Sequence, residues 1–215
     1  MARVKDDPGK PRKERSENAA RRRQQLLNAT LRSIVQNGLG RTTLATVATE
    51  AGLSQGVAVF YFQSKAGLLT EALREHYRRY QENWQSALAA AGEDPLDQLL
   101  AVIRADFDPS VCNSDALAIW FAYWGEQSST PEFAEISAEY DTERAQAIRD
   151  ICQRLLAGRT APDPGRLAEW IDGFTDAFWQ RLHLYPTTET AENAIVSTFD
   201  LVRHLLPDLG DRIRV

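Results

Sequence analysis

The stretch from Arg41 to Leu69 restricts the fold of this chain more than any other part of the sequence. Its first apolar residues recur at the spacing of one helical face: Leu44, Val47 and Ala48. Thr43 precedes them and is suited to cap that helix. Gly52 then allows a turn with positive φ at low steric cost, and Ser54 is suited to cap a second helix from Gln55 to about Phe60. The stretch therefore predicts two short helices joined by a tight turn.

The second of these helices starts with small or apolar residues: Gln55, Gly56, Val57 and Ala58. Such a helix can enter the major groove of DNA with its first turn facing the base edges. Gln55 is the one side chain there that can form two hydrogen bonds with a base, most naturally adenine, and Val57 and Ala58 can contact thymine methyl groups. Indirect readout of DNA shape can contribute the remaining specificity. The alternative interpretation is an ordinary helical hairpin packed in a core.

Two runs of residues resemble the DNA-binding domain of the TetR family of bacterial repressors: Thr43-Leu44-x-x-Val47-Ala48-x-x-Ala51-Gly52-Leu53-Ser54-x-Gly56 and Tyr61-Phe62-x-x-Lys65-x-x-Leu68-Leu69. The resemblance implies a homodimer that binds a palindromic operator in double-stranded DNA. It also implies two kinds of DNA contact. Residues facing the bases or the groove wall would be Thr43, Gln55, Gly56, Val57 and Val59, and residues contacting phosphate would be Tyr61 and Lys65.

The distribution of charge agrees with nucleic acid at one end of the chain. The 215 residues have a net charge of −5, but residues 1–80 carry +8 and residues 81–215 carry −13. A basic first part can bind phosphates while the acidic remainder points away. Arg22 and its two arginine neighbours lie near the start of the first expected helix, within reach of the DNA backbone. The sequence has neither an apolar signal region nor a run that spans a bilayer, which predicts a cytoplasmic protein without a membrane partner.

Apolar spacing and turn residues divide the chain into three parts. Residues 1–16 are expected to form a disordered basic arm, which is either a solvated tail or a DNA contact. Residues 17–64 are expected to form the helix-turn-helix domain, with its motif at about 43–62. Residues 65–215 are expected to form a helical regulatory and dimerisation domain. No segment alternates as a strand does, so the chain is predicted to be all α, with about nine helices.

The sequence contains no arrangement typical of an enzyme or of a metal site. His76, His183 and His204 are scattered, and the chain has neither a glycine-rich phosphate loop nor a nucleophile elbow. We therefore expect neither catalysis nor a cofactor. The two cysteines, Cys112 and Cys152, lack metal spacing and are expected to be buried thiols, with a redox-sensing pair as the alternative.

Aromatic residues are concentrated on two expected helices of the second domain. The first group is Trp120, Phe121, Tyr123 and Trp124, and the second includes Trp170, Phe174, Phe178 and Trp179. Beside acids such as Asp106, Asp172 and Asp176, these rings can form a box for an organic cation, because the face of an aromatic ring attracts a quaternary ammonium. The alternative is that the aromatic stripes are ordinary core. The predicted ligand site consists of Asp106, Trp120, Phe121, Tyr123, Trp124, Trp170, Phe174 and Phe178.

Part of the second domain resembles the BetI-like subgroup of the TetR family. The resemblance rests on Asp106-Phe107, Ser114-x-Ala116, Ala118-x-Trp120-x-Ala122-x-Trp124 and Ile171-Asp172-Gly173. It implies a repressor of choline-to-betaine genes that responds to choline. The alternatives are a regulator of unrelated genes that senses another small apolar or aromatic molecule, and a regulator controlled by a partner protein.

The family resemblance also implies how the dimer forms and how a ligand acts. The last two helices, expected at 166–184 and 189–206, would pair with their copies in a four-helix interface. The apolar stripe expected to form this interface is Ile195, Thr198, Phe199, Val202 and Leu206. A bound effector would favour a state in which the two DNA-binding domains are spaced wrongly for the operator, with the helix at about 65–91 carrying the displacement.

Overall fold

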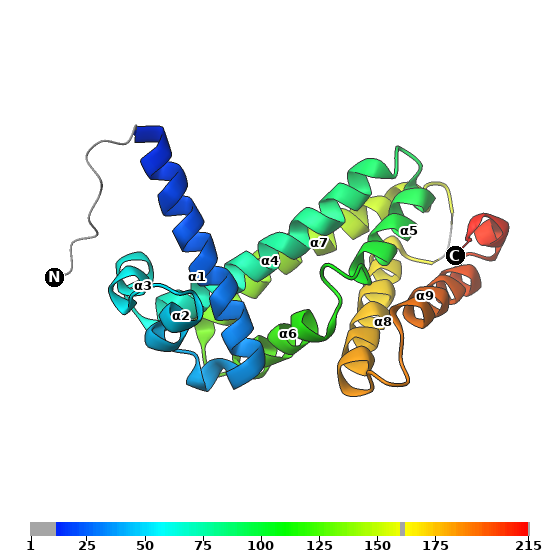
Figure 1. Cartoon of the computed structure of the whole chain (residues 1–215). Coiled ribbons are helices and arrows are strands. Elements are labelled where there is room, and N and C mark those ends of the chain that lie inside the picture. Colours follow the sequence, from blue (N-terminus) through cyan, green and yellow to red (C-terminus); the bar gives the residue numbers. More distant parts are fainter. Residues whose placement is uncertain (1–11, 160–161, 215) are drawn as a thin grey trace. The chain divides into compact units, whose positions relative to one another are not determined.

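The computed structural model describes residues 12–159 and 162–214, and every regular element in those ranges is a helix (Figure 1). The elements are α1 (Arg12–Arg41), α2 (Leu44–Glu50), α3 (Gln55–Phe62), α4 (Lys65–Ala90), α5 (Pro95–Asp106), α6 (Ser114–Glu126), α7 (Pro131–Leu155), α8 (Pro164–Leu184), α9 (Ala191–Leu205) and the 3₁₀-helix η1 (Pro207–Arg212). The predicted all-α class is confirmed. Within the described ranges, none of the helices is both long and apolar enough to cross a lipid bilayer.

The chain forms two compact units, and each unit consists of two separate segments of the sequence. Unit 1 consists of the described residues up to His76 together with Ile119–Ala134. Unit 2 consists of Tyr77–Ala118 and the described residues from Glu135 onwards. Unit 1 therefore extends beyond the helix-turn-helix domain expected at residues 17–64, because it takes in the first turns of α4, most of α6 and the start of α7.

Helix α1 begins earlier than the sequence suggests. Residues 12–16 of the expected arm belong to α1, while residues 1–11 lie outside the described part of the chain. Gly38 interrupts the helical geometry of α1, because this glycine has φ 73° and ψ 169°. A side chain is strained at such a positive φ, so glycine is favoured there.

Polar side chains cap the starts of several helices. Asp94, Asp163 and Thr190 accept hydrogen bonds from backbone N–H groups in the first turns of α5, α8 and α9. Helix α6 is capped by Asn113, whose side chain accepts a hydrogen bond from the Ala116 N–H at 3.0 Å.

The apolar stripe of α9 packs against other helices of the same chain. Thr198, Phe199 and Val202 are fully buried, and Leu206 is 1 % exposed. Helix α9 contacts α5, α8 and η1, and the guanidinium of Arg104 lies 4.7 Å from the centre of the Phe199 ring. The predicted dimer stripe is therefore wrong for these four residues, since a second chain cannot reach them. Of the five predicted residues, only Ile195 is half-buried.

Candidate functional site

Helix α3 is held by a short elbow that the local sequence builds. Thr43 and Thr46 form a reciprocal capping box at the start of α2, in which each hydroxyl accepts from the other residue's N–H. Gly52 turns the chain with φ 64°. Ser54 occupies the N-cap position of α3, but its side chain forms no capping hydrogen bond. The structure thus confirms the two helices and their turn, and α3 extends to Phe62.

Helix α3 has a buried side in unit 1 and an exposed side. Ala58 and Phe62 are buried. The exposed residues recur one helical turn apart and form a stripe: Gln55, Gly56, Val59 and Phe60. We call these four residues the exposed α3 stripe. The thymine contact expected of Ala58 is wrong, because this side chain is fully buried.

The other predicted DNA contacts differ in exposure and in their hydrogen-bond partners within the chain. Arg22 is exposed on α1, whereas Val57 and Tyr61 are half-buried on α3. Thr43 uses its hydroxyl in the capping box. Lys65 donates a hydrogen bond from Nζ to the Gly40 carbonyl oxygen at 2.5 Å, so its ammonium group has a partner within the chain.

The aromatic residues of α6 that belong to unit 1 are largely packing residues. Trp120 is 2 % exposed, and its ring centroid lies 4.3 Å from that of His76. Tyr123 is fully buried, donates from its hydroxyl to the Leu69 carbonyl oxygen at 2.8 Å, and meets Phe133 edge to face at 5.0 Å. Tyr123 therefore has no exposed surface with which to contact a ligand. Phe121 and Trp124 are half-buried, so their predicted ligand role remains a prediction.

The aromatic residues of α8 belong to unit 2 and have different environments. Phe178 meets Phe107 and Phe174 edge to face, with ring centroids 6.4 and 5.3 Å apart. Trp170 is 43 % exposed. Trp179, which the predicted site omits, is buried and donates from Nε1 to the Asp106 backbone carbonyl at 2.9 Å.

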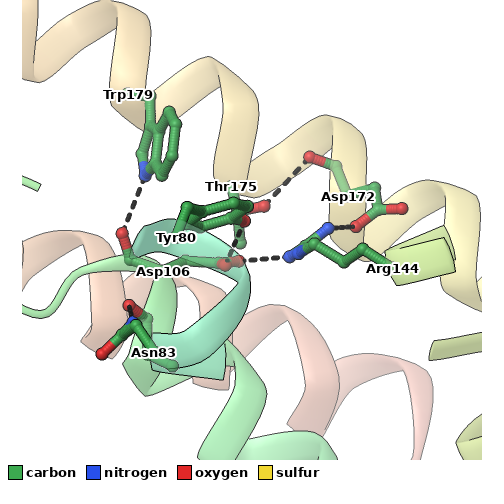
Figure 2. A network of polar contacts seen from close by, with 8 residues as sticks. Tyr80, Asn83, Asp106, Arg144, Asp172, Thr175 and Trp179 are labelled. Atoms are coloured by element: carbon green, nitrogen blue, oxygen red, sulfur yellow. Dashed lines mark hydrogen bonds and ion pairs between the residues drawn. The ribbon is translucent and has the colours of Figure 1, made fainter. Parts of the chain in front are cut away.

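A largely buried network of ion pairs and hydrogen bonds joins four helices of unit 2 (Figure 2). The guanidinium of Arg144 on α7 bridges two carboxylates: it lies 2.6 Å from Asp106 of α5 and 2.5 Å from Asp172 of α8. Tyr80 of α4 donates to the second oxygen of Asp106 at 2.8 Å, and the Arg144 guanidinium lies 5.7 Å from the Tyr80 ring centre. Asp106 was predicted to face a ligand, but it is buried and bound to Arg144 and Tyr80.

The environment sets the charges of this network. Burial lowers the pKa of Arg144, but the attraction of Asp106 and Asp172 outweighs burial, and the net shift is upward. The guanidinium therefore stays charged. Burial raises the pKa of Asp106, and Arg144 opposes that rise.

Two further carboxyl groups add to the acidity around Arg144. Both Asp141 and Asp176 reach solvent, yet the protein around them desolvates their carboxylates and raises each pKa to about 6. The charge of Asp172 raises both pKa values further, while Arg144 lowers them. Asp141 also accepts from the Tyr77 hydroxyl at 3.3 Å, and the Tyr77 ring stacks on Tyr140 at 5.0 Å. Above about pH 6, Asp141 and Asp176 thus add negative charge near Arg144, and the Tyr77 ring lies beside Asp141.

Sequence reasoning missed Arg144 and Tyr80. Arg144 lies 38 residues from Asp106 and 28 residues from Asp172, and α7 is rich in charged residues. No local signal separates this buried arginine from the solvated ones. No group of three or more described His, Cys, Asp or Glu side chains is arranged to hold a metal ion.

Two protein families match this chain, one in its N-terminal part and one in its C-terminal part. Residues 26–72 match the family described as bacterial regulatory proteins, tetR family, and residues 95–208 match the BetI-type transcriptional repressor, C-terminal, family. A protein from Stenotrophomonas maltophilia (strain R551-3), named HTH-type transcriptional regulator BetI, is 35 % identical over 160 residues, which cover 74 % of this chain and 80 % of the relative.

The chain belongs to the TetR family. Its C-terminal part is of the BetI type. A second regulator named BetI, from Paraburkholderia xenovorans (strain LB400), is 32 % identical over 160 residues, covering 74 % of this chain and 80 % of that protein. TetR-family proteins with BetI-type domains are transcriptional regulators and not enzymes, which confirms the expectation from the sequence.

Solved structures show the TetR fold as well. The putative transcriptional regulator from Pseudomonas aeruginosa PAO1 has a TM-score of 0.79 at 22 % identity, with 91 % of this chain and 95 % of that chain covered. A putative transcriptional regulator from Saccharomonospora viridis, solved in complex with choline, has a TM-score of 0.76 at 18 % identity, with 86 % of this chain and 97 % of that chain covered.

The cysteines of this TetR-family chain are unsuited to redox sensing at neutral pH. Cys112 and Cys152 are free and buried. Burial raises the pKa of each thiol to about 12. Because the thiolate is the reactive form, a thiol with so high a pKa is nearly inert near pH 7. The structure therefore favours the buried-thiol interpretation over the redox pair.

Proposed function

We propose that this TetR-family protein is a dimeric repressor that binds palindromic operator DNA and is released by a small organic cation of the choline type. The observation that carries the proposal is the acidic and aromatic environment of unit 2. Asp141 and Asp176 contribute charge beyond what Arg144 balances, and the stacked rings of Tyr77 and Tyr140 lie beside Asp141, to which the Tyr77 hydroxyl donates. An organic cation gains from both features, since carboxylates and ring faces attract it. The choline complex of the Saccharomonospora viridis protein supports the same ligand class.

The DNA-binding half of the proposal rests on the exposed α3 stripe. In a dimer, two such helices about 34 Å apart would enter successive major grooves on one side of the duplex. With the stripe of α9 buried, the proposed dimer surface moves to the remaining faces of α8 and α9. Trp170 and Leu184 of α8 are exposed apolar residues, and Ile195 and Leu201 of α9 are half-buried.

The proposed release is a shift between two populations. The ligand must bind more tightly to the state with the wrong spacing of DNA-binding domains, and its effect cannot exceed that difference in affinity. Helix α4 contributes residues to both units, so it is the proposed carrier of the displacement.

Calorimetric titration of the purified protein tests the ligand class. Choline is expected to bind, while 3,3-dimethylbutan-1-ol, its uncharged isostere, is expected to bind at least about tenfold more weakly, because the carboxylates and rings attract only the cation. Choline should also release the protein from DNA selected out of a random pool. Equal binding of the two compounds would contradict a cation site. If neither compound binds but DNA binding persists, a different effector or a partner protein is indicated.

The affinity for choline is expected to fall as the pH decreases below 6. Asp141 and Asp176 are charged above that pH and take up protons below it. Their pKa values are raised above the ordinary 3.8. Protonation between pH 6 and 4 therefore favours the folded state, but it removes negative charge that attracts the ligand. Choline titrations between about pH 5 and 8 check this expectation.

The pH prediction has a matched control. The double variant Asp141→Asn/Asp176→Asn should bind choline more weakly at neutral pH and should lose most of the pH dependence. A wild-type affinity that stays constant across this range would show that these two carboxyl groups do not face the ligand.

A further inference from the structure

The exposed α3 stripe contains an apolar side chain, Phe60, that the predicted DNA contacts leave out. Phe60 is 64 % exposed, and its sequence neighbour Val59, which is a predicted DNA contact, is 42 % exposed. Of the large apolar side chains described, Phe60 has the greatest exposed fraction. Leaving a phenyl ring in water is unfavourable, and exposed apolar patches commonly mark a binding surface.

The position of Phe60 on the helix places its ring beside the expected DNA-reading residues. Phe60 follows Gly56 by four residues, so the two lie on the same side of α3, and Gln55 and Val59 are paired in the same way along the exposed α3 stripe. Figure 1 shows α3 as a short helix of unit 1. Side chains on a helix lean toward its N-terminus, and the phenyl group therefore extends over the turn that begins with Gly56. Glycine has no side chain to compete for that space. The Phe60 ring also packs edge-on against Tyr61, with centroids 5.1 Å apart and an angle of 83° between the rings.

The chemistry of the stripe restricts what it can recognise. Gln55 is the one residue of the exposed α3 stripe whose side chain can form hydrogen bonds with a base edge. Val59 and Phe60 can make only apolar contacts. The major-groove edges of the four bases carry hydrogen-bond donors and acceptors, and the C5 methyl group of thymine is the apolar group among them. The chemical complement of this apolar surface is therefore a thymine methyl group.

We infer that Phe60 is a specificity-determining residue that reads the C5 methyl group of a thymine in each operator half-site. The inference rests on the proposed entry of α3 into the major groove. It replaces the thymine contact expected of the buried Ala58. Gln55 lies five residues nearer to the helix start, so the thymine should lie in the same half-site as the base that Gln55 contacts but not opposite the same side chain. Val59 extends the apolar surface.

Uracil substitution tests this contact directly, because uracil lacks only the methyl group of thymine. The full chain selects duplexes from a random pool, and each thymine of the selected half-site is then replaced singly by uracil. For wild type, one position is expected to show about fourfold weaker binding, the factor for burying one methyl-sized group. Phe60→Ala should bind the thymine and uracil duplexes equally. Low salt keeps the weaker complexes measurable, since phosphate contacts strengthen there.

A matched variant separates methyl readout from general loss of affinity. Gln55→Ala should weaken binding to both duplexes by roughly tenfold or more and keep the fourfold ratio between them. Phe60→Leu retains an apolar side chain and should keep part of the ratio. Unchanged thermal midpoints of these variants would show that the fold is intact, as expected for exposed side chains.

Three results would overturn the inference. If no uracil weakens wild-type binding, or if Phe60→Ala keeps the full ratio, Phe60 does not read a thymine methyl group, while operator binding by α3 still stands. If the pool yields no selected sequence at all, the proposed operator binding is itself wrong, and the role of Phe60 is wrong with it.

Discussion

Replacement of Arg144 by alanine is expected to lower the free energy of unfolding by about 3–5 kcal/mol, the usual loss when one partner of a buried ion pair is removed. The guanidinium is the cation that balances Asp106, whose side chain is 2 % exposed, and Arg144 itself is 12 % exposed. Without it, Asp106 must stay charged and unpaired or take up a proton. Urea denaturation followed by tryptophan fluorescence measures the loss.

Two controls make this result specific. Arg78→Ala removes an exposed arginine that pairs with Glu82 on α4, and it should change stability by no more than about 1 kcal/mol. In the Arg144→Ala background, Asp106→Asn should recover part of the loss, because an amide accepts the Tyr80 hydrogen bond without a buried charge. Losses that simply add in the double variant would show that charge balance is not what Arg144 provides.

Trp120→Ala is expected to destabilise the fold by about 3–5 kcal/mol as well, the range for truncating a large buried aromatic residue. Trp120 is 2 % exposed and packs against His76 and Trp124 within unit 1. Such a variant would lose DNA binding through loss of the fold. Loss of ligand response in Trp120→Ala therefore does not identify a ligand contact.

Thermal denaturation of three variants separates packing from ligand contact. Trp124→Ala, at a half-buried position, should destabilise the fold less than Trp120→Ala. Trp120→Phe keeps an aromatic ring and should retain most of the stability. If Trp120→Ala proves as stable as wild type, the tryptophan is not part of the unit 1 core, and its predicted ligand role gains weight.

The sequence predicts the helices of this protein well because their ends depend on nearby residues. A capping side chain, as at Thr43 or Asp94, and a glycine with positive φ, as at Gly52, act within a few residues of the chain. Spacing of apolar residues likewise indicates that a helix has a buried face. These signals are local, so they can be found without knowing what packs against each helix.

The errors arise where the answer depends on distant parts of the chain. The apolar stripe containing Phe199 shows that one face of α9 is buried, but spacing alone does not distinguish a helix of the same chain from a second subunit. The burial of Arg144 depends on aspartates from two other helices. Phe60 is the opposite case, because its apolar side chain gave no reason to expect exposure, whereas the packing of α3 leaves it 64 % exposed.

The discontinuity of unit 1 limits how its DNA-binding specificity can be transplanted. A fragment ending at His76 would lack Ile119–Ala134 and with them Tyr123, whose hydroxyl binds the Leu69 carbonyl oxygen. Leu68 and Leu69, which are buried in the intact chain, would lose part of their cover. A chimaera that exchanges unit 1 between relatives must therefore include both the segment up to His76 and Ile119–Ala134. An exchange of the helix-turn-helix unit therefore also exchanges Ile119–Ala134 in the middle of the chain.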